Sequence, residues 1–175
     1  KTIDDLIAEG KKRRVTYAST SPINVVAMFQ LAKLTGANFR WVVFGGGNVS
    51  VLQAVGGHVD AVIQTVTEMK PQMEAGTLRG LAAAGPVRWP EAPEMKTLRE
   101  MGYEAISTAV FGYAFPAGVD PAIRARMEKA MLDALAEKDV QEQIAKLGVV
   151  PSPATGQQFR DTLKKTETDS LPILI

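Results

Sequence analysis

Residues 41–60, WVVFGGGNVSVLQAVGGHVD, predict a complete unit of a parallel β-sheet. The run Trp41–Phe44 is apolar and rich in β-branched residues, which is typical of a short buried strand. Glycines 45–47 follow, and Asn48 can then cap an apolar helix over residues 49–55. A second strand begins after the next glycine pair. Strand, turn, helix and strand therefore succeed one another as in a parallel crossover.

The segments on both sides of this stretch continue the alternation. Val15–Ala18 predicts a strand, and Ser21 before Pro22 is a strong start for a helix. Residues 59–63 and 78–84 are further predicted strands, and a helix separates them. Strands that alternate with helices indicate an α/β fold with a mostly parallel sheet.

The C-terminal part of the chain predicts one long strand followed by three helices. Residues 108–115 are apolar and rich in aromatic side chains, as expected of a strand that crosses between two lobes. Asp120 before Pro121 is a strong helix start. Asp139 and Thr155 are the caps expected for the two helices that follow.

The composition argues against several classes of function. The 175 residues carry a net charge of +1 and 46% of them are hydrophobic, which supports a core but gives no argument for nucleic acid or an anionic membrane surface. The basic cluster Lys11–Arg14 is explained by a solvated helix end. Cysteine is absent and His58 is the single histidine, so thiol chemistry, a histidine metal site and a Ser-His-Asp triad are not expected. The glycine-rich nucleotide-binding motifs GxGxxG and GxxxxGK(S/T) are both missing from the sequence, and we expect no cofactor.

Loops at the carboxyl ends of predicted strands form the candidate binding site, because ligands bind at that edge of open parallel sheets. Hydroxyls and bare backbone N–H groups at two helix starts favour an anion such as a carboxylate or phosphate. The loops contain no lysine or arginine, which indicates recognition by neutral donors. The residues expected to line the site are Ser19, Thr20, Ser21, Asn24, Gly46, Gly47, Asn48, Gln64 and Thr65.

A catalytic function has little support in the sequence. Asp60, at a predicted strand, could act as a general acid or base, but no histidine or second carboxylate is apparent as its partner. A structural carboxylate that accepts backbone N–H groups is the better interpretation. Ser19 or Ser21 would need a base to act as a nucleophile, and none is identifiable.

Together the motifs resemble the periplasmic substrate-binding proteins of tripartite tricarboxylate transporters, the Bug family. The resemblance covers nearly the whole chain and rests on the stretches VTYASTSPIN, VVFGGGNV, GGHVDA, AGTLRGLAAAGPVRWPEAPEMKTLREMGYE and FPAGVDPAIRARMEKAM. Phe44 and Gly45 depart from a tyrosine and a lysine in the common family pattern. Asn24 is the counterpart of a family histidine.

The resemblance implies a two-lobed periplasmic-binding-protein type II, or Venus-flytrap, fold without catalysis. Residues 1–105 would form most of lobe two, the central ligand-binding lobe. Residues 106–175 would form the crossover strand and the C-terminal part of lobe one, with the N-terminal part of the family pattern absent. The resemblance further implies a periplasmic protein, although no signal peptide is present in the sequence. It would hold a di- or tricarboxylate, or an aromatic carboxylate, for membrane transporter subunits.

Three further expectations concern partners and alternatives. Apolar faces of lobe one that lack their natural cover would favour self-association of this chain. An effector-sensing domain of a transcription regulator can share the architecture, but no helix-turn-helix precedes Lys1 in the sequence. A small α/β enzyme acting on an anionic substrate would require a catalytic dyad. The sequence upstream of Lys1 would distinguish the transport function from the regulatory one, because a signal peptide favours transport and a DNA-binding helix pair favours regulation.

Overall fold

The structure is a computed structural model that describes residues 1–90, 92–147 and 149–174, and the side chains of 1–168 within these ranges. The chain divides into two compact units, of which the first spans Lys1–Ala109 and the second Val110–Ile173. This division lies close to the boundary that the sequence suggests after residue 105. The assignment of the two units to the lobes of a Venus flytrap stays a prediction.

A parallel three-stranded sheet organises the first unit. Its strands are β1 (Val15–Ser19), β2 (Phe39–Val43) and β3 (Ala61–Val62), in the order β2-β1-β3. β1 is central, and Tyr17 stands opposite a residue of β2 on one side and of β3 on the other. The parallel α/β architecture expected from the alternation of strands and helices is confirmed.

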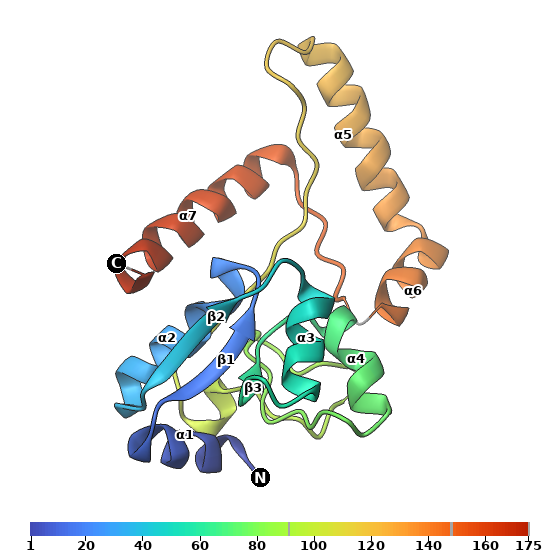
Figure 1. The fold of residues 1–175 in the computed structure, drawn as a ribbon. Helices are drawn as coiled ribbons and strands as arrows, with labels where there is room; N and C mark the ends of the chain where they lie inside the picture. Colours follow the sequence, from blue (N-terminus) through green and yellow to red (C-terminus); the bar gives the residue numbers. More distant parts are fainter. Residues whose placement is uncertain (91, 148, 175) are drawn as a thin grey trace. The chain divides into compact units, whose positions relative to one another are not determined.

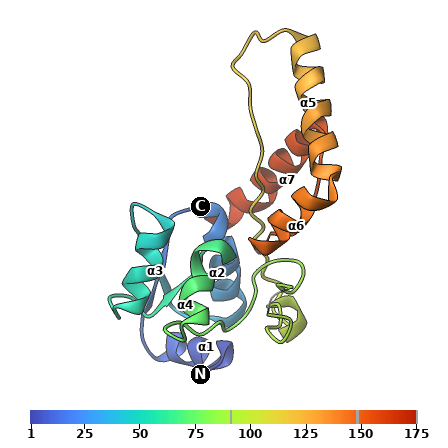
Figure 2. The same ribbon diagram turned by 90° about the vertical axis from the view of Figure 1, so that its right-hand side faces the viewer.

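Helices cover both faces of this sheet. The first unit contains α1 (Ile3–Lys12), α2 (Pro22–Thr35), α3 (Gly47–Val55), α4 (Val66–Glu74) and the short 3₁₀ helix η1 (Arg99–Met101). α2 contacts β1 and β2, whereas α3 contacts β1, β3 and α4. The crossover from β1 to β2 and the crossover from β2 back over β1 to β3 run in opposite directions, and right-handed connections then place α2 and α3 on opposite faces of the sheet (Figure 1). Figure 2 shows α3 and α4 side by side.

Local capping signals explain where the first two helices begin and where α2 ends. Asp5 N–H donates to Thr2 Oγ1 at 3.2 Å and Thr2 N–H donates to Asp5 Oδ2 at 2.8 Å, which is a complete capping box. Ser21 caps α2, whose first residue is Pro22, as the sequence predicts. Gly36 ends α2 in the left-handed region at φ 71°, where a side chain would cause strain.

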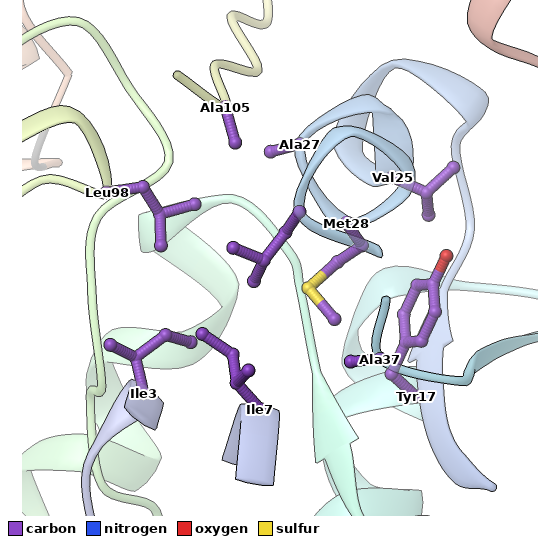
Figure 3. Packing of buried hydrophobic residues seen from close by; sticks show 10 residues of the cluster. Ile3, Ile7, Tyr17, Val25, Ala27, Met28, Ala37, Leu98 and Ala105 are labelled. Atoms are coloured by element: carbon purple, nitrogen blue, oxygen red, sulfur yellow. The ribbon is translucent and has the colours of Figure 1, made fainter. Parts of the chain in front are cut away.

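The main core lies between α1, α2 and the sheet. Ile3 and Ile7 form the apolar stripe of α1 and point toward Met28 of α2 (Figure 3). Leu31 and Tyr17 are fully buried in the same cluster. Each such side chain contributes about 1.5–3 kcal/mol by leaving water. This packing anchors β1 in the core, and the loop of the candidate site starts at its carboxyl end.

Two predicted strands are absent from the part of the chain that the structure describes. Residues 78–84 carry only an isolated parallel bridge between Ala83 and Thr97. Gly80 packs closely against the side chains of Met73 and Met95, where a β-carbon would overlap Met95 Sδ and Met73 Cε. Residues 108–115 are also not a strand. Both runs have strand-like composition, but a strand requires a neighbour for its backbone hydrogen bonds.

The second unit consists of an extended segment and helices α5 (Pro121–Ala136), α6 (Lys138–Lys146) and α7 (Gly156–Leu174). Asp120 Oδ1 accepts from Ala122 N–H at 2.6 Å and Thr155 exchanges hydrogen bonds with Gln158, so these two predicted starts are confirmed. The predicted cap Asp139 is wrong: α6 begins two residues earlier, after Glu137.

The second unit has no interior of its own among the residues whose burial is described, none of which is buried. The ring of Phe159 packs onto the backbone at Gly112, and Glu128 Oε2 accepts from Gly156 N–H at 2.8 Å. None of the helices in the described ranges combines the length and apolar character needed to cross a bilayer.

Candidate ligand-binding site

The candidate site lies where the chain reverses its direction across the sheet. The connection after β1 leads away to β2, and the connection after β2 passes back over β1 to reach β3. The carboxyl ends of β1 and β3 therefore form a topological switch point, which is the position where open parallel sheets leave a crevice for ligands. Ser19 ends β1, and Gln64 follows β3 by two residues.

Gln64 joins the loops on the two sides of this switch point. The residue is 7% exposed. Gln64 Oε1 accepts from Ser19 Oγ at 3.3 Å and from Asn24 Nδ2, while Gln64 Nε2 donates to Thr20 Oγ1 at 2.7 Å. One buried amide thus holds three of the predicted site residues together. Since Gln64 uses both ends of its amide in this way, it positions other side chains.

Thr20 and Asn24 are the side chains that this network presents. Thr20 Oγ1 accepts from Gln64, which leaves its own O–H as a donor for a ligand. Asn24 directs one of its two amide hydrogens to Gln64 and has a second to offer. Trp41 Nε1 donates to the Ser19 carbonyl at 3.0 Å, which fixes the loop from the neighbouring strand. Sequence reasoning did not single out this tryptophan for the site.

Ser21 acts as a helix cap in the structure. Its Oγ accepts from Ile23 N–H at 3.3 Å, and its carbonyl accepts from Asn24 N–H at 3.1 Å. Ser21 therefore shapes the start of α2 beside Thr20.

The start of α3 approaches the same network. Gly46 is the N-cap, with an extended backbone (φ −178°, ψ 154°) and no side-chain cap bond. A β-carbon placed on Gly47 would lie 2.5 Å from Gln64 Nε2 and would overlap the Glu68 carboxylate, so only glycine fits this approach without displacing them. The expected cap at Asn48 is wrong, because Asn48 is already the second residue of α3 and is exposed.

Glu68 is a site residue that the sequence analysis missed. It lies in the first turn of α4, and Thr65 Oγ1 donates to Glu68 Oε2 at 2.6 Å. The other side of its carboxylate packs against Gly47 of α3. The spacing Thr65-x-x-Glu68 is that of a capping box and could have drawn attention to this side chain. Its place beside Gly47 could not be read from spacing, because it depends on how α3 and α4 pack.

Asp60 has a structural role at the opposite end of the strands. Its carboxylate accepts from Thr16 N–H at 2.8 Å and from Thr16 Oγ1 at 2.9 Å. Arg13, at the end of α1, donates to both Asp60 oxygens, at 2.8 Å and 3.1 Å. The hydrogen bonds from Arg13 and Thr16 lower the pKa of Asp60 to about 2. The expectation that Asp60 accepts a backbone N–H is confirmed.

We expect the Asp60→Asn variant to lose about 1–3 kcal/mol of unfolding free energy at neutral pH, since it weakens a charged hydrogen-bonded pair. A carboxyl whose pKa is lowered by folding stabilises the protein above its unfolded pKa of about 4. That contribution is lost as the pH falls toward about 2, the pKa of folded Asp60. Urea unfolding at several pH values should therefore show the difference between wild type and variant shrinking over this window.

The matched control is Asp133→Asn, which breaks an exposed pair with Lys129 on α5. Exposed ion pairs contribute about 0–1 kcal/mol to stability, so this substitution should hardly change the free energy of unfolding. A stability difference for Asp60→Asn that stays constant from neutral to acidic pH would contradict the assigned cause.

Residues 1–174 match the family described as Tripartite tricarboxylate transporter family receptor. This chain belongs to that family. The receptor-family relatives include the UPF0065 protein in the gbd 5' region of Cupriavidus necator, 31% identical over 173 residues, which are 94% of this chain and 53% of the relative. Protein BugT of Bordetella pertussis (strain Tohama I) is 31% identical over 91% of this chain and 50% of its own length. The chain thus spans about half the length of these curated relatives.

Solved structures agree on the fold of this receptor-family chain. R. palustris Rpa4515 with adipate superposes with a TM-score of 0.88 at 20% identity and covers 98% of this chain and 59% of its own. MatC from Rhodopseudomonas palustris with bound malate gives 0.75 at 18% identity, over 100% of this chain and 62% of its own. Another neighbour is described as periplasmic binding protein BugD. The predicted α/β periplasmic-binding-protein fold class and Bug-type family are confirmed.

Proposed function

We propose that this chain contributes the ligand-binding wall of an extracytoplasmic solute receptor that captures a small organic carboxylate for a tripartite tricarboxylate-type membrane transporter. The observation that carries the proposal is the buried Gln64 amide, which joins Ser19, Thr20 and Asn24 at the switch point of the sheet. Membership of the receptor family supports the transport role. Relatives of the same fold described with adipate and with malate support the carboxylate class.

The donors at this wall suit a carboxylate. Thr20 and Asn24 can each donate a hydrogen bond, and the first turn of α3, which has no side-chain cap bond, holds backbone N–H groups without partners inside the helix. The start of α2 offers less, because Pro22 has no N–H and the N–H groups of Ile23 and Asn24 already bond to Ser21. Residues 19–24, 45–48 and 63–65 contain no lysine or arginine. Recognition would therefore use neutral donors and the start of α3, which hold an anion without the strong field of a cationic side chain.

Simple energetics indicate weak binding by this wall alone. Hydrogen bonds to a charged group are worth about 1.5–3 kcal/mol each, and a partly buried helix start adds up to about 2 kcal/mol. Two or three such contacts give about 6 kcal/mol before the cost of immobilising the ligand. Micromolar affinity requires about 8 kcal/mol, so we expect roughly millimolar dissociation constants for this chain and much tighter binding by a two-lobed receptor.

The proposed receptor binds its ligand without converting it. Ser19 Oγ donates to an uncharged amide and so has no base to activate it as a nucleophile. Asp60 is committed to Arg13 and Thr16 at the far end of the strands. Turnover of a bound acid by this chain would contradict this part of the proposal.

The test compares Gly46→Asp with Gly46→Asn. A β-carbon at Gly46 would meet only Val49 Cγ2, at 3.7 Å, and the backbone there is extended, so both side chains fit. Both are good N-caps and have nearly the same size, hence their difference isolates the negative charge at the start of α3. In titrations with adipate, malate and citrate followed by NMR, Gly46→Asp should bind at least about tenfold more weakly than Gly46→Asn.

Two results would count against this function. Equal affinities of the two Gly46 variants would place the carboxylate away from the start of α3. Absence of any saturable shift with all three acids in the wild-type chain would remove the support for carboxylate capture by this wall.

A further inference from the structure

The carboxylate of Glu68 lies against the first residue of α3. A β-carbon built on Gly47, the first residue of α3, would overlap Glu68 Oε1 and Cδ, so the carboxylate lies directly against the Gly47 backbone. Thr65 Oγ1 holds the other oxygen, Glu68 Oε2, at 2.6 Å. The same built β-carbon would lie 2.5 Å from Gln64 Nε2. Glu68 therefore lies beside the buried network at the switch point.

A carboxylate is favourable at this place for the same reasons that a ligand carboxylate would be. The first turn of a helix presents N–H groups that have no partner inside the helix, and the helix dipole favours negative charge there. The N-cap of α3, Gly46, provides no side-chain cap bond. Glu68 therefore brings a negative charge from α4 beside this start, where its carboxylate contacts Gly47 but accepts its hydrogen bond from Thr65 and none from an N–H of α3.

Glu68 is also able to leave this place. It is the third residue of α4 and is only partly buried. Its side chain has three rotatable bonds, so the carboxylate can swing away while the helix stays where it is. The interaction that such a movement breaks with Thr65 is a single hydrogen bond to a hydroxyl.

We propose that Glu68 is an internal competitor of the ligand: its carboxylate stands beside the anion position at the start of α3, and a ligand carboxylate that binds there must push it away. This inference rests on the proposed function, because it concerns the same wall. Glu68 would act as a specificity-determining residue that lowers the affinity for every simple carboxylate. It would favour acids whose additional contacts with the protein compensate for the free energy of displacing the Glu68 carboxylate.

Glu68→Gln tests the competition, because it keeps the size of the side chain and removes its charge. We expect the affinities for adipate and for malate to rise by about fivefold or more, the effect of roughly 1 kcal/mol at a helix start. Glu74→Gln is the matched control, since Glu74 lies at the end of the same helix with its side chain largely exposed. The control should leave both affinities unchanged. An unchanged or weaker affinity in Glu68→Gln would overturn the proposal.

A second measurement separates this inference from the proposed function. The backbone amide signal of Gly47 is followed by NMR while inorganic phosphate is added to wild type, Glu68→Gln and Glu74→Gln. A larger phosphate-dependent shift in Glu68→Gln alone supports the competition. It does so even if none of the three proteins binds adipate or malate, and that result would contradict only the proposed carboxylate function. Equal shifts in all three proteins would overturn the competition even if both acids bind.

Discussion

The full chain is expected to self-associate in solution, whereas a chain ended at Ala109 should be monomeric. The reason lies in the second unit, which has no buried residue among those described. Phe111 and Tyr113 are 75% and 82% exposed on the extended segment before α5. Their alternation places them on one side of a segment whose backbone hydrogen-bonding groups are not paired in a sheet.

The expected gain from covering this surface is large. Burial of apolar surface contributes about 25 cal/mol of free energy per Å², so covering several hundred Å² would stabilise the assembly by on the order of 10 kcal/mol. That amount equals the whole stability of an ordinary domain. A second copy of the chain can provide such cover by pairing the extended segments, which supplies both strand hydrogen bonds and contacts for the aromatic rings.

Light scattering coupled to size-exclusion chromatography measures the outcome directly. Phe111→Ser with Tyr113→Ser should reduce the association, since it removes the apolar contacts of that segment. Leu34→Ser is the control, because Leu34 is an exposed apolar residue of α2 in the first unit. A full chain that runs as a single monomeric species over a wide concentration range would show that the second unit needs no partner.

Gln64→Met is expected to have the second largest effect. Methionine keeps the length of the side chain but offers no amide, so Ser19, Thr20 and Asn24 all lose a partner near a buried position. Each unpaired buried polar group costs about 1–3 kcal/mol, and water can reach some of them. We therefore expect a loss of about 3 kcal/mol in unfolding free energy. Binding of adipate or malate should fall below detection, because Thr20 and Asn24 are no longer held in place.

Gln72→Met provides the comparison for this variant. Gln72 lies on α4 and is partly buried, and its side-chain amide accepts one hydrogen bond, from Thr77. Chemical denaturation should give a loss below about 1 kcal/mol for this change, with binding intact. If the two glutamine variants were equally stable, Gln64 could not be the residue that holds the site together.

Local signals in the sequence located most helix starts, because capping is decided within four residues. Thr2 with Asp5, Ser21 with Pro22 and Asp120 all cap as predicted. The errors at Asn48 and Asp139 have the same local origin. In both regions an earlier residue, Gly46 or Glu137, adopts the N-cap conformation without a side-chain cap bond, and propensity alone gives no sign of this.

Predicted strands were less secure, because pairing is not a local property. Residues 15–18 and 41–44 have neighbours in the sheet and overlap β1 and β2. Residues 78–84 and 108–115 have a similar composition, but within the described part of the chain neither segment pairs with another strand in a β-ladder. The composition of a segment indicates that it can extend, whereas the hydrogen bonds of a strand come from elsewhere in the chain.

By itself the sequence determined the family, the alternating α/β order and the two loops from which a site could be built, because glycine turns, caps and apolar runs act over a few residues. Only the tertiary structure decided how those loops meet. The order β2-β1-β3 brings Gln64 to Ser19, and the packing of α4 against α3 brings the Glu68 carboxylate to Gly47. Such contacts depend on where whole elements pack, and no spacing within one segment contains that information.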